Sequence, residues 1–298
     1  CSVRRQRQMC IRDSSKADNT LRAYKSDFRD FAAFCAKHGF KSLPSEPKIV
    51  SLYITHLSKN SKISTLRRRL VSISMVHKLK GHYLDTKHPI IVENLMGIRR
   101  VKGSIQKGKK PILINHLKSI INVIDDQRIE EIKKLRDKSI ILIGFGGGFR
   151  RTELISIDYE DLEFVPEGLK INIKKSKTDQ FGEGMIKGLP YFTNEIYCPV
   201  KNLKRWLEIS NIRSGPIFRR FSKGLSLTDK RLTDQSVVLL MKEYLNLAGI
   251  ENKNFAGHSL RSGFATVAAE SGADERSIMA MTGHKTTPVS YTHLTLPT

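Results

Sequence analysis

The sequence predicts a mainly α-helical fold with a small antiparallel β-sheet, an α+β architecture divided into two domains. Through most of the chain, apolar residues recur at steps of three and four, which is the spacing of one face of an amphipathic helix. Between residues 157 and 192 the pattern changes to alternation of apolar and polar residues, which favours strands. A basic, glycine-containing stretch without apolar periodicity, residues 99–111, is typical of a linker.

The first predicted domain covers residues 15–98 and is all helical. Its first helix is expected over residues 19–35, where five side chains share one face: Leu21, Tyr24, Phe28, Phe31 and Cys35. Glycine and proline residues mark where the following helices begin and end. These three helices are expected over residues 48–60, 64–81 and 85–100.

The second predicted domain covers residues 112–288. Leu169, Ile171 and Ile173 alternate with polar residues, and the turn-rich "KTDQFGEG" separates them from "MIKGLPYF". This pattern predicts a hairpin or small sheet. Helices are expected on both sides of it, over residues 114–126, 129–144, 199–210, 233–248, 258–271 and 274–282.

The charge of the chain narrows the class of partner. The formal net charge is +23, and a protein this basic usually binds a polyanion, most often nucleic acid. No apolar run approaches the roughly eighteen residues of a membrane span, and no signal peptide is evident. The four cysteines, Cys1, Cys10, Cys35 and Cys198, show no zinc-ligand spacing. We therefore expect no metal, free thiols and a cytoplasmic location.

Both ends of the sequence resemble translated sequencing adapter. The last ten residues are what GTC TCT TAT ACA CAT CTG ACG CTG CCG ACG encodes, and Arg4 to Asp13 is what CGT CGG CAG CGT CAG ATG TGT ATA AGA GAC encodes. The two strings are reverse complements over most of their length and resemble the transposon-end adapter of sequencing libraries. We interpret residues 1–14 and 289–298 as adapter translation. The chain without them is still strongly basic.

Four short stretches of the second domain carry chemically capable side chains. "GGGFRRTEL" holds Arg150, Arg151 and Glu153 behind three glycines, and "KKSKTDQ" places Lys177 in the predicted hairpin turn. Taken alone, each is typical of surface charge. No Gly-Lys-Ser/Thr follows the glycines, which excludes a phosphate-binding loop of the nucleotide-binding kind.

The other two stretches contain histidines. In "GHSLRSGFAT", His258 and Arg261 lie three residues apart on one helix face near its start, where the helix dipole favours an anion. A capping or core histidine is the alternative interpretation of His258. In "MTGHKTT", His284 follows a glycine that ends a helix, which alone would be unremarkable.

Taken together and in this order, the stretches resemble the tyrosine recombinase (phage integrase) family of site-specific DNA recombinases. "NTLRAYKSDFRDFAAFC", "STLRRRLVSISMVHK", "CPVKNLKRWL" and "AGHSLRSGFATVAAESGADERSIMAMTGH" are close to that family's usual sequences, and the resemblance covers about residues 15–287. It implies a helical, SAM-like core-binding domain followed by the family's catalytic domain. It also implies double-stranded DNA as the partner, a homotetramer on DNA and a nucleoid-associated cytoplasmic protein.

The resemblance also implies a reaction and its residues. A tyrosine attacks the scissile DNA phosphate and forms a 3′-phosphotyrosyl intermediate that conserves the bond energy, so no cofactor is needed. Arg150 and Arg261 would clamp the phosphate, because guanidinium groups bind phosphate bidentately. Lys177 would be the general acid for the leaving 5′-oxygen. His258 and His284 would hydrogen-bond the phosphate, and Glu153 would brace Arg150. Arg151 would be a neighbour of the clamp.

The nucleophile and the DNA contacts complete the expected site. In the family the tyrosine usually falls about nine residues after the second histidine, at a spacing set by helix geometry. That position here is His293, not Tyr291, so we interpret Tyr291 as part of the adapter tail and expect this chain to bind DNA without cleaving it. Seven basic residues are expected to contact DNA: Arg67, Arg68, Arg69, Arg99, Arg100, Lys109 and Lys110.

Three alternatives remain open from the sequence. One is a catalytically inactive relative that only binds DNA, and another is an enzyme of the type IB topoisomerase kind, which uses the same chemistry. The third is a basic helical binding protein without this activity. The form of the first domain disfavours the topoisomerase. Integration, excision and the resolution of chromosome dimers would all use these residues, so the sequence does not choose among them.

Overall fold

The computed structural model describes residues 18–103, 108–174 and 184–283. The chain divides into two compact units, Cys1–Lys107 and Gly108–Thr298. The division falls inside the stretch that we expected to be the linker, residues 99–111. Within the described residues, no helix is long and apolar enough to cross a membrane.

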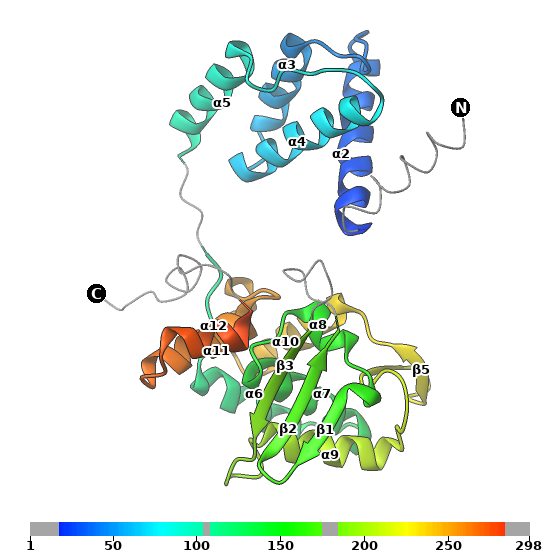
Figure 1. Ribbon diagram of the computed structural model, residues 1–298, viewed down its shortest axis with the longest axis vertical. Helices are drawn as coiled ribbons and strands as arrows, with labels where there is room; N and C mark the ends of the chain where they lie inside the picture. Colours follow the sequence, from blue (N-terminus) through cyan, green and yellow to red (C-terminus); the bar gives the residue numbers. More distant parts are fainter. Residues whose placement is uncertain (1–17, 104–107, 175–183, 284–298) are drawn as a thin grey trace. The chain divides into compact units, whose positions relative to one another are not determined.

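The first unit is helical throughout its described part (Figure 1). Its helices are α2 (Asp18–Lys37), α3 (Pro47–Ser58), α4 (Ile63–Leu79) and α5 (Pro89–Lys102). Helix α2 packs against α4, and α3 packs against α5. The core between them contains Phe31, Tyr53, Ile54, Leu66 and Ile73, each almost fully buried. Helix α5 continues to Lys102. Arg99 and Arg100, which we expected at the start of the linker, therefore lie in the last turn of this helix.

The second unit combines helices with two small antiparallel sheets. Strands β1 (Leu162–Val165), β2 (Gly168–Ile173) and β3 (Met185–Pro190) form one sheet in that order, and β4 (Arg219–Phe221) pairs with β5 (Leu227–Arg231) in the other. The helices are α6 (Ile114–Asp126), α7 (Glu131–Gly146), α8 (Arg151–Ser156), α9 (Pro199–Ser210), α10 (Asp234–Leu247), α11 (Ser259–Glu270) and α12 (Glu275–Thr282). The predicted class, mainly α with a small antiparallel sheet, is confirmed.

Helix α7 is the centre of the second unit. From Leu135 to Phe145 every one of its residues is buried, and it packs against α9, α11 and α6. The indole of Trp206 on α9 is fully buried and donates to the carbonyl oxygen of Ile217 at 2.9 Å. Burial of so much apolar surface provides most of the stabilisation of the unit. It also fixes the end of α7, where the candidate site begins.

Candidate active site

The turn between α7 and α8 contains Gly147 and Gly148, and at Gly148 there is no room for a side chain. Gly148 has a φ of +54°, in the left-handed region that glycine enters without strain. A Cβ on Gly148 would lie 2.8 Å from the Phe264 ring on α11 and 3.3 Å from Thr282 on α12. The glycine therefore lets α11 and the end of α12 come close to the turn.

Arg150 directly precedes α8 and is held by Glu153. The main-chain N–H of Arg150 donates to Oε2 of Glu153 at 3.0 Å, and its Nη1 donates to Oε1 at 2.6 Å. The Glu153 side chain is 1% exposed. Nη2 of Arg150 donates to the carbonyl oxygen of Gly283 at 3.4 Å. One buried carboxylate thus caps the start of α8 and orients the guanidinium.

Arg261 extends from α11 into the same region and is 4% exposed. Its Nη1 donates to the carbonyl oxygen of Gly148 at 2.9 Å, and its Nη2 donates to the carbonyl oxygen of Thr282. Burial, and to a smaller extent the charge of Arg150, lowers the pKa of Arg261 to about 10, while Glu153 opposes the shift. The guanidinium is therefore still charged at neutral pH.

The two arginines meet at the end of α12, where they contact the consecutive carbonyl groups of Thr282 and Gly283. The arrangement brings two like charges together, and Glu153 is the carboxylate that offsets them. Two guanidinium groups carry more N–H donors than these oxygens occupy. The pair is therefore suited to bind a further anion, and a tetrahedral phosphate fits its bidentate geometry.

His258 lies one residue before α11, in the turn that leads to Arg261. It is exposed, and its carbonyl oxygen accepts from the N–H and the Oγ of Ser262 at 2.9 and 3.0 Å. Its main-chain carbonyl thus helps to start the helix, while its exposed imidazole is not part of the core. The alternative of a core histidine is not what the structure shows.

Arg151 is directed away from the pair. Its Nη1 lies 3.7 Å from Oδ2 of Asp234, and its side chain covers Gly257, where an added Cβ would come within 2.2 Å of Nε. Arg151 therefore packs beneath the turn that carries His258, as a neighbour of the two arginines.

Several of the sequence-predicted residues lie outside the described part of the chain: Lys177, His284, Tyr291 and His293. In the sequence, Lys177 falls between the end of β2 at Ile173 and the start of β3 at Met185. His284 follows Gly283, whose carbonyl group Arg150 contacts.

One buried residue of the site was not predicted from the sequence. Lys187 on β3 is fully buried, and its Nζ donates to the carbonyl oxygen of Gly147 at 2.7 Å. It also lies 4.0 Å from Oε2 of Glu153. The alternation of "MIKGLPYF" contained a signal, because Lys187 shares the inward phase with Met185 and Leu189. A lysine is rarely fully buried unless it is paired, so a lysine at an inward position of a strand indicates a special role.

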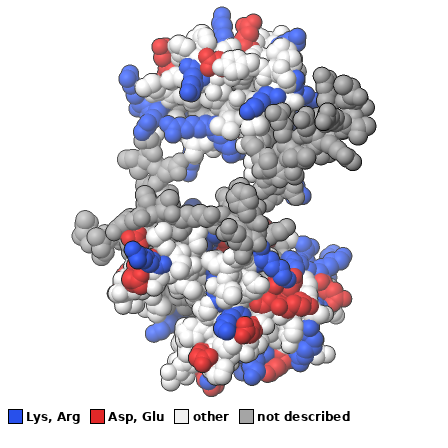
Figure 2. Space-filling view, in the orientation of Figure 1, with Lys and Arg blue, Asp and Glu red and all other residues white. Residues whose placement is uncertain are grey.

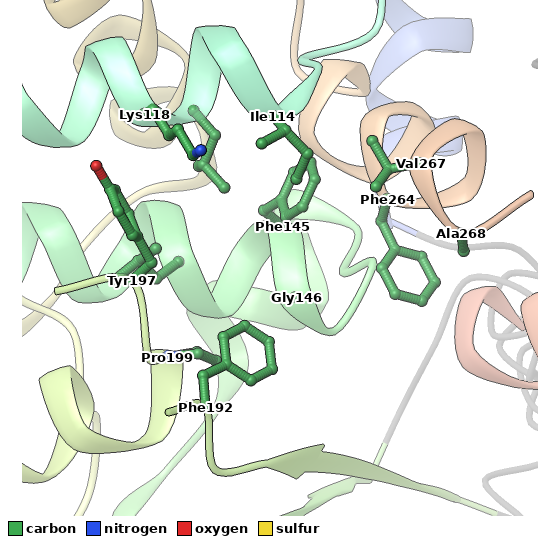
Figure 3. Close-up of a pocket in the computed structure, with 12 residues that line it drawn as sticks. Ile114, Lys118, Phe145, Gly146, Phe192, Tyr197, Pro199, Phe264, Val267 and Ala268 are labelled. Carbon is green, nitrogen blue, oxygen red and sulfur yellow. The ribbon is translucent and has the colours of Figure 1, made fainter. Parts of the chain in front are cut away.

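A separate cavity lies beside the site but has a different character. Its volume is about 360 Å³, and it is lined mainly by apolar groups of α6, α7, α11 and the start of α9. Figure 3 shows the rings of Phe145, Phe192 and Phe264 around it. The one charged lining residue is Lys118, so the cavity is not where a phosphate would bind. Among the described residues, no cluster of His, Cys, Asp or Glu could hold a metal ion.

The basic residues at the start of α4 divide into two kinds. Arg69 is 18% exposed, and its guanidinium binds Asp27, Asp30 and the hydroxyl group of Tyr53. Arg68 is 47% exposed and binds Oδ2 of Asp27 at 2.5 Å, and Arg67 is exposed. Arg68 and Arg69 thus have partners within the unit, while the expected contact of all three arginines with DNA stays a prediction.

The remaining basic residues of the predicted DNA surface are exposed. Arg99 and Arg100 lie in the last turn of α5. Lys109 and Lys110 begin the described part of the second unit, and Nζ of Lys109 donates to the carbonyl oxygen of Lys253 at 2.5 Å. On the face in view in Figure 2, blue Lys and Arg side chains outnumber red acidic ones on the first unit, while the two are mixed on the second.

Known proteins resemble this chain over most of its length. Residues 112–296 match the sequence profile of the phage integrase family, a match that includes Tyr291. The integrase/recombinase xerD homolog of Selenomonas ruminantium is 42% identical over 276 residues, which are 92% of this chain and 80% of that protein. The tyrosine recombinase XerC of Leptospira interrogans is 24% identical over 287 residues, which are 95% of this chain and 85% of that protein.

Solved structures show the same fold at low sequence identity. The Tn1549 transposon integrase in complex with transposon right end DNA has a TM-score of 0.67 at 16% identity, covering 98% of this chain and 94% of that one. A lambda integrase dimer bound to a COC′ core site has a TM-score of 0.64 at 15% identity, covering 97% and 93%. The profile match and the Selenomonas relative place the chain in the phage integrase family, and it is a tyrosine recombinase.

Proposed function

We propose that Arg150 and Arg261 bind the scissile phosphate of double-stranded DNA, which this recombinase cuts and rejoins through a 3′-phosphotyrosyl intermediate. The observation that supports the proposal is the convergence of two guanidinium groups, that of Arg261 buried and that of Arg150 partly buried, on consecutive carbonyl groups at the end of α12. Among the residues that the structure describes, Glu153 is the carboxylate that contacts Arg150. A phosphate would balance the remaining positive charge.

In this reaction the main task of the residues around the phosphate is to stabilise the charge of the transition state. Attack of a tyrosine on the phosphate places negative charge on the non-bridging oxygens in the transition state. Donors that are already oriented stabilise that charge without reorganisation. Arg261 is oriented by two carbonyl groups, and Arg150 by one carboxylate and one carbonyl group. The geometry therefore supports transition-state stabilisation as the main contribution of these residues.

Three further residues have roles that rest on their place in the sequence. The exposed imidazole of His258, at the start of α11, would donate a hydrogen bond to the phosphate. We propose that Lys177 protonates the leaving 5′-oxygen and that His284 assists at the phosphate. These roles follow the order of motifs in the family to which the chain belongs.

The DNA duplex would be held by both units. The exposed guanidinium groups of Arg67 and Arg68, together with Arg99, Arg100, Lys109 and Lys110, would contact phosphates and release counterions. Solved structures of similar fold include integrases that are bound to DNA. We further propose that four copies assemble on DNA and that the protein is associated with the nucleoid.

The test compares a small phosphate analogue with duplex DNA. Orthovanadate is a tetrahedral oxyanion like a phosphate group, so Arg261→Lys, which keeps the charge but loses the bidentate fork, should weaken its binding by about tenfold or more. Affinity for a mixed-sequence duplex, measured by fluorescence anisotropy, should change by less than about threefold because many other phosphate contacts remain. The matched control is Arg205→Lys, an exposed arginine on α9.

The same test addresses a relative that only binds DNA. In such a protein, Arg261→Lys would leave orthovanadate binding unchanged or would reduce both affinities together. Either result would remove the assignment of Arg261 to the phosphate. Loss of orthovanadate binding in Arg205→Lys would show that the analogue binds elsewhere.

A further inference from the structure

The sheet of the second unit places a lysine where its pattern calls for an apolar residue. In β2, Leu169, Ile171 and Ile173 point into the core, and Ile171 pairs with Lys187 across the strands. Lys187 is fully buried, while its neighbour Ile186 is 69% exposed. Strand alternation therefore puts a cation inside and an isoleucine outside. Local rules are usually broken in this way at functional positions.

The ammonium group of Lys187 is bound on several sides. Nζ donates to the carbonyl oxygens of Gly147 at 2.7 Å and Gly148 at 3.4 Å. It lies 4.0 Å from Oε2 of Glu153 and 4.3 Å from the centre of the Phe149 ring. Carbonyl oxygens, a carboxylate and an aromatic face are each favourable partners for a buried cation.

The partners of Lys187 are also the partners of the two arginines. The carbonyl group of Gly148 accepts from Lys187 and from Nη1 of Arg261. Oε2 of Glu153 faces Lys187 and accepts from the main-chain N–H of Arg150. One shared oxygen therefore links Lys187 to each arginine.

We propose that Lys187 is a positioning residue of the phosphate site, whose ammonium group orients Arg261 through Gly148 and Arg150 through Glu153 and adds its charge to theirs. The inference rests on the proposed function of the two arginines. Lys187 is fully buried, and this positioning role is distinct from the general acid role proposed for Lys177.

The charges around Lys187 give the proposal a measurable signature. The pKa of Lys187 is lowered to about 7, chiefly by burial; Glu153 opposes this shift, and the charges of Arg261 and Arg150 add to it. A bound dianion would add negative charge next to these groups and raise the pKa again. Lys187 is mostly neutral at pH 8 in the free protein, so binding of a dianion at that pH should take up a proton.

The experiment uses sulfate, a dianion that does not itself titrate near neutral pH. Its binding is measured by calorimetry at pH 8 in buffers of different ionisation enthalpy, which gives the affinity and the number of protons taken up. Lys187→Met keeps the length of the side chain and removes the charge. Lys170→Met, on the exposed face of β2, is the matched control. Arg261→Lys reports whether sulfate binds at the arginines at all.

We expect Lys187→Met to bind sulfate on the order of tenfold more weakly and without the proton uptake seen in the wild type and in Lys170→Met. Lys187→Arg, whose charge is permanent, should retain binding and also lose the uptake. It serves as the second variant if Lys187→Met does not fold. The inference would be overturned if Lys187→Met bound sulfate with wild-type affinity and proton uptake. It would also be overturned if proton uptake persisted in Lys187→Arg, or if Lys170→Met lost affinity and proton uptake as much as Lys187→Met.

A different result is expected if the proposed function of the two arginines is wrong. In that case sulfate binding would be the same in the wild type and in Arg261→Lys. If Arg261→Lys loses sulfate binding while Lys187→Met keeps both affinity and proton uptake, the arginine site stands and the role of Lys187 is wrong.

Discussion

Arg150 and Arg261 contact neighbouring peptide groups, with Nη2 of Arg150 donating to Gly283 O and Nη2 of Arg261 donating to Thr282 O. The two arginines come from parts of the sequence more than a hundred residues apart. The end of α12 therefore aligns them in the folded protein. Arg261 is oriented by two main-chain carbonyl groups, and Arg150 by one main-chain carbonyl group together with the carboxylate of Glu153.

Removal of the negative charge of Glu153 should destabilise the second unit. Glu153→Gln leaves Arg150, Arg261 and Lys187 without their carboxylate partner, and loss of one member of a buried charged network costs roughly 2–4 kcal/mol. Urea denaturation should show this loss, and added sulfate should restore part of it because an anion replaces the missing charge. Glu163→Gln, an exposed carboxylate on β1, is the control. Equal stability of the two variants would contradict the bracing role of Glu153.

The stability of the second unit should rise with pH above neutrality. The pKa of Lys187 is about 7 in the folded protein and has its ordinary value of 10.5 in the unfolded chain. Between these values the unfolded chain binds more protons, so the free energy of unfolding increases with pH. The expected slope is at most about 1.4 kcal/mol per pH unit, from pH 7 to about 8.5, where thiols begin to titrate. Urea denaturation at several pH values measures the slope, which should be absent in Lys187→Met.

Arg67 and Arg69 should have opposite roles although only two residues separate them. Arg69→Met removes contacts to Asp27, Asp30 and Tyr53 and should lower the free energy of unfolding of the first unit by roughly 1–3 kcal/mol. Arg67→Met should leave stability unchanged and reduce the slope of DNA affinity against salt concentration by about one phosphate contact. A salt slope that changes only in Arg69→Met would reverse this assignment.

Tyr291 is expected not to form a covalent bond with DNA. Its place relative to His284 is two residues short of the expected spacing, and it lies in the segment that we interpret as adapter translation. On a pool of nicked duplexes with a randomised core, the chain as it stands should give no adduct that survives denaturing electrophoresis. A chimaera that takes the corresponding C-terminal segment from the Selenomonas relative, from residue 288 onward, is the positive control. An adduct at Tyr291 that disappears in Tyr291→Phe would refute the adapter interpretation of this residue.

The sequence predicted the elements whose apolar residues repeat regularly, and these are the helices that form the two cores. It did not predict β4 and β5, because their residues, "RRF" and "LTDKR", are mostly polar and exposed and their pairing depends on contacts across the turn. The arginines were found because a motif identified them. Lys187 was missed because its importance comes from the sheet register, which places it against a turn forty residues earlier in the chain.

The lack of space at Gly148 limits which residues natural variants of this protein can have at position 148. Alanine there would push the Phe264 ring and Thr282 outward, and the carbonyl groups that orient Arg261 would move with them. No ionisable group would have changed, yet the anion site would be misaligned. Lineages that retain recombination should therefore exchange exposed lysines of this unit far more readily than this one glycine, and a variant found at position 148 would mark a gene drifting out of use.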